Sequence, residues 1–388
     1  MKKPINIVAG ENIPYVKEAF EGLGNLTILP GRSITSADLK DTNTLLIRSI
    51  TQVNEGLLKG TPVEFVGSAS AGTDHMDTAY LNARNIGFAS AAGSNANSVA
   101  EYIMAALLLL GKQQGFSLLG KTIGIIGVGN IGKLVKQKAE ALGMSPILND
   151  PLLEETGQID HRSLEETLSC DVVTLHTPLT TDEPYPTYHM LNEQTIKWLK
   201  PSAVFINAAR GEVVDTTALL KAITHKKIGP TIIDVWEHEP EINWDFFQAV
   251  TLGTPHIAGH SLDGKANGTF MIYAALCKHL GIEPTWDPGQ SLPPPIVPFI
   301  EVNTDPQSGQ EQLRQMVTKI YDIVADYHRM QKLLVASPNE RPTLFDALRK
   351  DYPVRREFHR TTVKLPGHRS ELRQIIAELG FSEIHEDP

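Results

Sequence analysis

The sequence predicts an α/β protein with two lobes, each built on a doubly wound parallel sheet, and a smaller α+β domain at the C-terminal end. Three observations lead to this fold class. Short apolar runs alternate with segments of helical spacing over residues 5 to about 282, which is typical of parallel sheets covered by helices. One of these runs opens into a glycine-rich turn. A proline-rich segment at residues 284–300 then marks a change of pattern.

A strand–turn–helix–strand unit at residues 121–150 organises the middle of the chain. Its apolar run, residues 123–126, leads into a G-x-G-x-x-G turn, and residues at helical spacing follow. In such a turn the first glycine allows the tight bend, the second lets the backbone approach a pyrophosphate, and the third lets helix and strand pack closely. The N–H groups at the helix N-terminus bind the phosphates. We therefore expect a Rossmann-like dinucleotide site at Gly127, Gly129, Asn130, Ile131 and Gly132.

Asp150 ends the second strand of this unit. An acidic residue roughly 20 residues beyond the glycine-rich turn hydrogen-bonds the adenosine ribose hydroxyls. A carboxylate there repels a 2′-phosphate, so the predicted cofactor is NAD rather than NADP. A glycine-rich turn that binds phosphate without catalysis remains an alternative.

The composition limits the classes of partner. With 388 residues the chain is expected to form two or three domains. A formal net charge of −10 argues against nucleic acid or an anionic membrane as a partner. Cys170 and Cys277 are too few for a disulfide framework or a metal site, and we expect buried thiols. The N-terminus lacks the apolar region of a signal peptide, so we expect a cytoplasmic protein.

Residues 1–95 are expected to form the substrate-binding lobe, completed by about 257–282, and residues 96–256 the NAD-binding lobe. The strands expected in the first lobe are residues 5–10, 44–48 and 63–67. The NAD-binding lobe begins with a helix at residues 98–111. We expect Ser98 to cap this helix, because Glu101 stands at the spacing of a capping box.

Residues 283–388 are expected to form a proline-rich linker and a C-terminal domain. Apolar residues on one face predict a single helix over residues 310–328. A basic stretch at residues 348–360 and a strand–helix tail follow it.

Further strands of the NAD-binding lobe also end in polar or small residues. Because the carboxyl ends of parallel strands meet at one edge of a sheet, and ligands bind there, these groups are expected to gather beside the glycine-rich turn. The strands, each with the residues expected to follow or end it, are 171–176 with Thr177, 203–207 with Ala208, Ala209 and Arg210, 231–235 with Asp234 and Glu239, and 250–252 with His256.

Three of these side chains predict an alcohol flanked by a carboxylate as the substrate. Arg210 can hold a carboxylate through two parallel N–H bonds, and His256 can move a proton near neutral pH. Glu239 can orient His256 and favour its charged form. Taken one at a time, Arg210 can equally be a surface salt bridge, His256 a structural histidine and Glu239 a solvated acid. Asp234 either bonds the nicotinamide carboxamide or caps its own turn.

The motifs G-V-G-N-I-G, N-A-A-R-G, D-V-W-E-H-E-P and P-H-I-A-G, in this order, resemble those of the D-2-hydroxyacid dehydrogenases. Further matches run from residues 11–15 to residues 345–350, so the resemblance covers nearly the whole chain. It implies an enzyme of this family that forms a homodimer through its C-terminal segment. The residues to which it assigns roles are the catalytic Arg210, Glu239 and His256 and the NAD contacts Asp150, Thr177, Ala208, Ala209, Asp234 and Gly259.

The substrate contacts expected from the resemblance are Ser49 and Ser70, with Arg48 and His260 as further candidates. The family usually has tyrosine at the position of His260 and often threonine at that of Ser70, and both replacements can still hydrogen-bond a phosphate. Arg349 and Arg355 in the basic stretch are candidates for a second cation that reaches such a phosphate.

Two other readings remain open from the sequence. Another dehydrogenase of the same family, such as one acting on 3-phosphoglycerate, would share the catalytic trio, which binds only the hydroxy-carboxylate end. A non-catalytic NAD-sensing protein would share the fold, since fold alone does not determine function.

Overall fold

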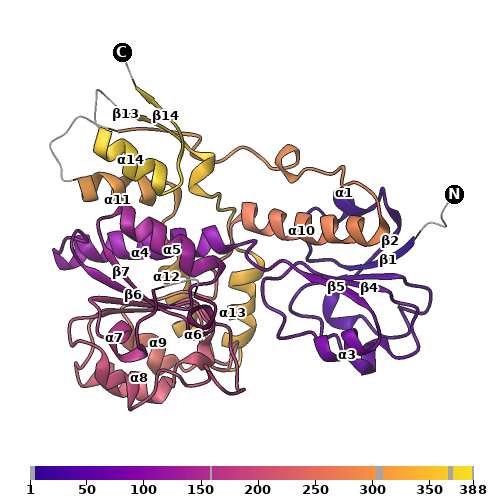
Figure 1. Cartoon of the computed structure of the whole chain (residues 1–388), viewed down its shortest axis with the longest axis horizontal. Helices are drawn as coiled ribbons and strands as arrows, with labels where there is room; N and C mark the ends of the chain where they lie inside the picture. Colours follow the sequence, from indigo (N-terminus) through magenta and orange to yellow (C-terminus); the bar gives the residue numbers. More distant parts are fainter. Residues whose placement is uncertain (1–4, 158–159, 303–308, 366–369, 387–388) are drawn as a thin grey trace. The chain divides into compact units, whose positions relative to one another are not determined.

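The computed structural model describes residues 5–157, 160–302, 309–365 and 370–386. The predicted fold class is confirmed, because the described helices flank parallel sheets (Figure 1). The chain forms two compact units, of which one comprises Met1–Asn95 and Ser261–Pro294 and the other Ala96–His260 and Pro295–Pro388. Each unit is described by itself.

The first unit contains a five-stranded parallel sheet in the order β2-β1-β3-β4-β5. Its strands are β1 (Ile5–Gly10), β2 (Gly24–Leu29), β3 (Thr44–Ile47), β4 (Phe65–Ser68) and β5 (Gly87–Ser90). Its helices are α1 (Val16–Phe20), α2 (Glu55–Leu58), α3 (Thr78–Ala83) and α10 (Leu262–Leu280).

The central strands of this sheet are apolar on both faces. In β3, Leu46 packs with Ile272 of α10, whereas Leu45 and Ile47 pack with Leu81 of α3 on the other face. This double burial explains why β1, β3 and β4 stand out in the sequence as apolar runs. β2 and β5 lie at the sheet edges with half-exposed residues, so their apolar pattern is weaker and the sequence did not predict them.

The second unit contains a six-stranded parallel sheet in the order β11-β10-β9-β8-β6-β7. Its strands are β6 (Thr122–Ile126), β7 (Ser145–Asn149), β8 (Val172–Leu175), β9 (Val204–Asn207), β10 (Thr231–Ile233) and β11 (Leu252–Gly253). The helices around it are α4 (Ala96–Gln114), α5 (Asn130–Ala141), α6 (Pro151–Glu155), α7 (Leu164–Leu168), α8 (Thr216–Thr224) and α9 (Trp244–Ala249).

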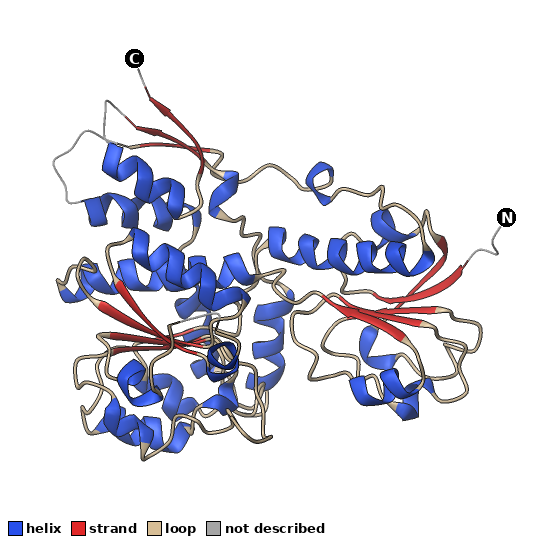
Figure 2. Cartoon of the chain, in the orientation of Figure 1, coloured by secondary structure: helices blue, strands red, loops and turns tan. Residues whose placement is uncertain are grey.

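Both faces of this sheet are covered, as Figure 2 shows. On one face Ile125 packs into a core with residues of α4 and α5. On the other face Ile126 packs with Leu168 of α7 and Phe246 of α9. Neighbouring residues of β6 therefore belong to different cores.

The C-terminal region adds a three-stranded parallel sheet in the order β12-β13-β14 and four helices. These elements are β12 (Phe299–Glu301), α11 (Gly309–Ile320), α12 (Ile323–Gln331), α13 (Arg341–Lys350), β13 (Thr362–Leu365), α14 (Ser370–Glu378) and β14 (Ser382–Glu386). The single helix predicted over residues 310–328 is wrong. Asp322 interrupts it, because its side chain accepts the N–H groups of Val324 and Ala325 and so caps a second helix.

The C-terminal region contributes to both cores of the NAD-binding fold. Helix α11 lies beside α4 (Figure 1). Its residues Leu313 and Met316 belong to the core that contains α4. Met330 of α12 and Phe345 of α13 belong to the other core, which also contains Trp236. The region is therefore packed into the NAD-binding unit rather than tethered to it.

The predicted cap at Ser98 is wrong. Helix α4 begins at Ala96, which places Ser98 and Glu101 inside it. The Ser98 hydroxyl donates to Glu357 at 2.7 Å, and Glu101 accepts the backbone N–H of Phe358 at 2.8 Å. Both side chains thus serve the docking of the C-terminal region, a tertiary role that the local spacing does not reveal.

These contacts bury a group of charges between α4, α5 and the C-terminal region. Burial and the neighbouring Glu357 carboxylate raise the pKa of Glu101 to about 8. Burial also lowers the pKa of Lys138, whose ammonium donates to the Leu379 carbonyl at 2.5 Å. Asn97 donates to both carboxylates, to Glu101 at 2.9 Å and to Glu357 at 2.7 Å.

We expect the Glu101→Gln variant to lose part of the pH dependence of stability. Because the folded protein raises the pKa of Glu101 from 4.5 to about 8, protonated Glu101 stabilises the fold. That stabilisation is complete below about pH 4.5 and is lost as the pH rises through about 8, and it amounts to roughly a few kcal/mol. Urea unfolding at pH 5, 6.5 and 8 measures it. Equal pH dependence in wild type, Glu101→Gln and the exposed control Glu140→Gln would contradict this role.

Candidate active site

The loops that carry the predicted site residues of the NAD-binding unit follow strands of one parallel sheet. The carboxyl ends of these strands therefore point to one edge, and β6 lies at the point where the strand order changes direction. The glycine-rich turn follows β6, Thr177 follows β8, Arg210 follows β9, Glu239 follows β10 and His256 follows β11. The topology brings these loops together as expected.

The glycine-rich turn has the geometry that a pyrophosphate requires. Gly127 has φ 87°, and a Cβ at Gly132 would lie 2.1 Å from the Gly127 carbonyl oxygen, so helix α5 can approach β6 only with glycine there. A Cβ at Gly129, by contrast, would meet nothing within 4 Å. No side chain of the described residues caps α5, so the N–H groups of its first turn, at Asn130 and Ile131, need another acceptor.

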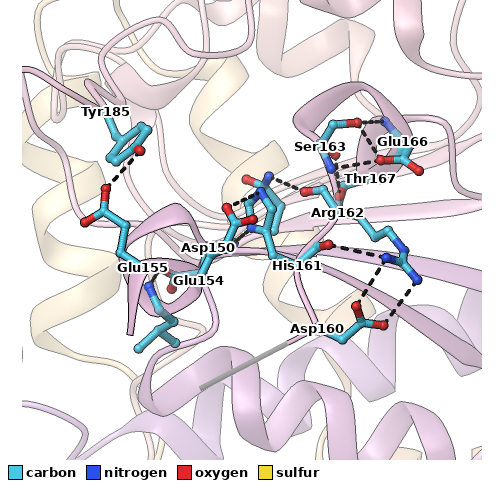
Figure 3. A network of polar contacts seen from close by, with 12 residues as sticks. Asp150, Glu154, Glu155, Asp160, His161, Arg162, Ser163, Glu166, Thr167 and Tyr185 are labelled. Carbon is cyan, nitrogen blue, oxygen red and sulfur yellow. Dashed lines mark hydrogen bonds and ion pairs between the residues drawn. The ribbon is translucent and has the colours of Figure 1, made fainter. Parts of the chain in front are cut away.

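Asp150 lies at the end of β7 beside this turn, within the polar network of Figure 3. Its carboxylate accepts the N–H groups of Val128 at 2.8 Å and Leu153 at 3.2 Å, so it connects the glycine-rich turn to α6. Its own N–H donates to Nδ1 of His161 at 3.2 Å.

The surroundings of Asp150 are acidic. Glu154 contacts Nε2 of His161 at 3.3 Å, and Glu155 accepts the Tyr185 hydroxyl at 3.0 Å (Figure 3). A cluster of carboxylates at this position is unfavourable for a 2′-phosphate. This agrees with the choice of NAD.

Thr177 offers a polar atom to a ligand. Its Oγ1 is buried and, among the residues that the structure describes, has no hydrogen-bond partner. Buried hydroxyls rarely stay unpaired, so this atom fits a cofactor contact at the end of β8. The turn, Asp150 and Thr177 together fit a dinucleotide.

The loop with Arg210 is shaped by its neighbours in sequence. The Asn207 side chain accepts the N–H of Ala209 at 3.1 Å and donates to the Arg210 carbonyl at 2.9 Å. The Arg210 guanidinium donates to the Ala209 carbonyl at 2.8 Å. A Cβ at Gly211 would lie 2.0 Å from the carbonyl carbon of Trp236, so only glycine allows this loop to contact the loop after β10.

Glu239 and His256 form a hydrogen-bonded pair. Nδ1 of His256 lies 2.7 Å from Oε2 of Glu239, and Oε1 of Glu239 accepts the N–H of Trp236 at 2.9 Å. Burial alone would raise the pKa of Glu239, but His256, the Arg349 guanidinium and the Trp236 N–H together lower it below its ordinary value. Glu239 is therefore a carboxylate that faces the imidazole.

Asp234 holds the segment that carries His256, Thr254–His260, which we call the catalytic loop. Its buried carboxylate accepts three donors, from the Thr254 hydroxyl at 2.6 Å, the Ile257 N–H at 2.8 Å and the Ala258 N–H at 2.9 Å. The predicted alternative, that the Asp234 side chain caps its own turn, is wrong. Its carboxylate instead accepts hydrogen bonds from the loop after the neighbouring strand β11. The nicotinamide contact remains a prediction.

The sequence analysis did not single out Trp236. Its backbone N–H holds Glu239, and its indole N–H donates to the Thr254 carbonyl at 2.9 Å. Its ring packs against Phe246 and Phe247 of α9. A tryptophan within D-V-W-E-H-E-P, next to the site, was the available signal.

The predicted substrate contacts Arg48, Ser49 and Ser70 belong to the first unit. Ser49 and Ser70 follow β3 and β4, and the Ser49 N–H donates to the Ser70 hydroxyl at 3.0 Å. Arg48 donates to the Asn12 carbonyl at 3.3 Å. The structure therefore brings two of these residues into direct contact.

The remaining candidates lie in the NAD-binding unit. The His260 ring lies edge-on to Tyr352 with their centroids 5.8 Å apart. The suggestion that Arg355 binds the substrate phosphate is withdrawn, because this side chain is buried and donates to main-chain carbonyls. Arg349 remains a candidate and acts on the pKa of Glu239.

The predicted burial of the two cysteines is confirmed. Cys170 and Cys277 are buried free thiols. Among the described residues, no group of histidine, cysteine and carboxylate side chains could hold a metal ion. No described helix combines the length and the apolar character needed to cross a membrane.

Comparison with known proteins identifies the family. A family model described as "D-isomer specific 2-hydroxyacid dehydrogenase, NAD binding domain" matches residues 100–258, and one described as a domain of unknown function matches residues 291–380. Erythronate-4-phosphate dehydrogenases of Escherichia coli and Shigella boydii are 42% identical over 98% of this chain and 99% of their own length. The chain belongs to the D-isomer specific 2-hydroxyacid dehydrogenase family. The resemblance drawn from the motifs is confirmed.

Solved structures agree with this assignment. D-lactate dehydrogenase from Aquifex aeolicus, complexed with NAD and lactic acid, is 26% identical with a TM-score of 0.58, covering 71% of this chain and 96% of its own. The NAD-bound 3-phosphoglycerate dehydrogenase of Entamoeba histolytica is also 26% identical, with a TM-score of 0.60 and coverages of 72% and 96%. The chain is an NAD-dependent D-2-hydroxyacid dehydrogenase.

A pair of glycine variants separates cofactor contact from packing. We expect Gly129→Ala to unfold at the wild-type temperature, because its methyl group meets no protein atom, but to bind NAD at least about tenfold more weakly, since the backbone can no longer approach the pyrophosphate. Gly132→Ala should be destabilised, because its methyl group meets the Gly127 carbonyl. Calorimetry of NAD binding and thermal unfolding measure both. Wild-type NAD affinity in Gly129→Ala would contradict the placement of the pyrophosphate.

Proposed function

We propose that this chain oxidises 4-phospho-D-erythronate to (R)-3-hydroxy-2-oxo-4-phosphooxybutanoate with NAD, a step of vitamin B6 (pyridoxal 5′-phosphate) biosynthesis. The observation that carries the proposal is the Glu239–His256 pair, 2.7 Å apart, in a chain 42% identical along nearly its whole length to enzymes named erythronate-4-phosphate dehydrogenase. The residues of the site supply the groups that this oxidation needs.

His256 acts as the base in this proposal. Its Nδ1 faces Glu239, so the tautomer with hydrogen on Nδ1 donates to the carboxylate and leaves a lone pair on Nε2. Nε2 accepts the proton of the 2-hydroxyl group. The carboxylate of Glu239 then stabilises the imidazolium that forms, as in other acid–base pairs of this kind.

Arg210 binds the substrate carboxylate. Its guanidinium has five N–H donors in a fixed fork, which matches a carboxylate with two parallel bonds. Held in this way, the 2-hydroxyl has one orientation relative to His256. In the reverse reaction Arg210 also stabilises negative charge on the carbonyl oxygen.

The bonds of the reaction balance between the substrate, this chain and the cofactor. The O–H bond breaks with its proton passing to His256, and the C2–H bond breaks as the C=O bond forms. NAD, when bound, accepts the hydride from C2. His256 later releases its proton to water, which returns the site to its starting state.

The phosphate end of the substrate is assigned to other residues. We propose that Arg48, Ser49, Ser70 and His260 contact it, because hydroxyl, imidazole and guanidinium groups all donate to phosphate oxygens. The NAD contacts that we propose are the glycine-rich turn, Asp150, Thr177, Ala208, Ala209, Asp234 and Gly259.

We further propose a cytoplasmic homodimer joined by residues 283–388. Several large apolar side chains of this region are exposed, among them Ile296 at 82% and Val335 at 92%. Exposed apolar side chains of this number on one region are typical of a protein–protein interface. They support an assembly role for the C-terminal region beside its packing role.

The substrate is tested by turnover on 4-phospho-D-erythronate and on 3-phosphoglycerate with NAD, with 2-oxoglutarate added to reoxidise the cofactor. We expect kcat/KM to be at least about a hundredfold higher for the four-carbon acid, roughly 2.7 kcal/mol of transition-state discrimination. Preference for 3-phosphoglycerate would leave the proposed mechanism intact but contradict the proposed substrate. Bound NAD without turnover on either acid would favour the sensor reading.

Replacement of His256 tests the proton step. His256 has φ 55°, so asparagine, which tolerates left-handed backbone, keeps the loop conformation. We expect kcat of His256→Asn to fall by about 10²–10⁴, while NAD affinity stays within a few fold. Glu239→Gln should lower kcat as well, since a neutral amide no longer stabilises the imidazolium. The exposed His225→Asn is the control, and equal turnover in all variants would exclude His256 as the base.

A further inference from the structure

We propose that Arg355, in the C-terminal region, is a positioning residue that holds the catalytic loop, so that this region is part of the catalytic machinery as well as a packing and assembly element. The proposal rests on the proposed function in one respect, that His256 on this loop transfers the proton. Its structural part, the control of the loop by Arg355, stands independently of the substrate.

Arg355 connects two segments that are far apart in the sequence. Its Nη2 donates to the Ala258 carbonyl at 2.6 Å and to the Ser98 carbonyl at 3.2 Å. Ala258 follows His256 by two residues, and Ser98 lies in the first turn of α4. The guanidinium therefore holds the catalytic loop against the start of this helix.

The peptide groups of Ala258 are held from two sides. Asp234 accepts the Ala258 N–H at 2.9 Å, and Arg355 donates to the Ala258 carbonyl. The His256 N–H in turn donates to the Asp234 carbonyl at 2.7 Å. Without Arg355 the buried Ala258 carbonyl would lose a charge-assisted bond. The loop would then be favoured to shift to a position where this carbonyl finds another donor.

The buried side chain of Arg355 makes its bonds to Ala258 and Ser98 through Nη2. It is only 5% exposed, and its Nε and Nη1 have no hydrogen-bond partner among the described residues. The ring of Tyr321 lies 4.4 Å from its guanidinium carbon, which favours the buried cation. Burial alone would lower the pKa of Arg355, but Tyr352, Tyr321, Glu101 and Asp326 raise it, so the group stays charged.

The two carbonyls that Arg355 binds lie close to places where the chain passes between the two units. The chain enters the NAD-binding unit at residues 95/96, leaves it at 260/261 and enters it again at 294/295. Ser98 and Ala258 each lie within a few residues of one crossing, and both carbonyls bind the same nitrogen of Arg355. A displaced Arg355 would therefore loosen both segments together.

Glu357 provides a matched control on the same stretch of chain. Its carboxylate accepts the Ser98 hydroxyl at 2.7 Å and the Asn97 amide at 2.7 Å, so it docks the C-terminal region on α4. The bonds to the Ala258 peptide groups on the catalytic loop come instead from Arg355 and Asp234. Glu357→Gln weakens the docking and leaves the Ala258 carbonyl with its partner.

The experiment compares wild type, Arg355→Met, Arg355→Lys and Glu357→Gln. Methionine fills a similar volume without charge, and lysine keeps the charge but cannot reproduce the fork. Hydrogen–deuterium exchange of the Ile257 and Ala258 amides reports the loop directly, and NAD affinity, kcat and KM are measured on the same samples. A role in docking alone would not change loop exchange or kcat specifically.

We expect exchange at Ile257 and Ala258 to be at least about tenfold faster in Arg355→Met and intermediate in Arg355→Lys. kcat should fall by about 10- to 100-fold in Arg355→Met, as for a small misplacement of a catalytic group, with a KM change of only a few fold. Arg355→Lys should recover part of kcat. Glu357→Gln should retain wild-type loop exchange and kcat within about twofold.

Wild-type loop exchange and wild-type kcat in Arg355→Met would overturn the proposal, and so would an equal loss in Glu357→Gln. If Arg355→Met does not fold, Arg355→Lys decides by the same two measurements. Absence of wild-type turnover on the proposed substrate would instead contradict the proposed function. The exchange data and the NAD affinity would still decide the role of Arg355.

Discussion

The arrangement of the site depends on the buried carboxylate of Asp234. It joins the end of β10 to the catalytic loop through the Thr254 hydroxyl and the N–H groups of Ile257 and Ala258. A buried carboxylate is stable only when its oxygens are hydrogen-bonded, so these bonds are obligatory and the loop conformation is well determined. Trp236 adds the indole bond to Thr254 and the N–H bond to Glu239. His256 and Glu239 can therefore meet.

The C-terminal region adds further contacts to this scaffold. Its helices share both cores of the NAD-binding fold, and Glu357 and Phe358 bond to the first turns of α4. Arg349 lowers the pKa of Glu239, and Arg355 bonds to the catalytic loop. A region that supports the site in this way is under functional as well as packing constraints. Because the pKa of the buried Glu101 carboxyl is raised, the docking of the C-terminal region on α4 also depends on pH.

The sequence alone predicts some of these structural features and misses others, because the features leave patterns of different strength in the sequence. Strands buried on both faces were found because β3 and β9 are continuous apolar runs, whereas the half-exposed edge strands β2 and β5 were missed. Side chains that follow strands, such as Arg210 and Glu239, could be placed because the order of parallel strands fixes their edge. The predicted cap at Ser98 is wrong because its hydroxyl bonds Glu357, far along the chain. The break of the predicted helix at Asp322 comes from a local cap, for which aspartate is a common residue. Bonds to main-chain carbonyls, such as those of Arg355, leave no pattern in a sequence.

The central claim is that loops after three neighbouring strands place Arg210, Glu239 and His256 around one hydroxy acid. A crystal structure of the wild-type protein with NADH and 4-phospho-D-erythronate, a combination that cannot react, tests it most directly. The account predicts the 2-hydroxyl within about 2.6–3.2 Å of Nε2 of His256, with Nδ1 still on Glu239 and the carboxylate on the Arg210 guanidinium. A 2-hydroxyl held by another side chain, or a carboxylate bound away from Arg210, would contradict it.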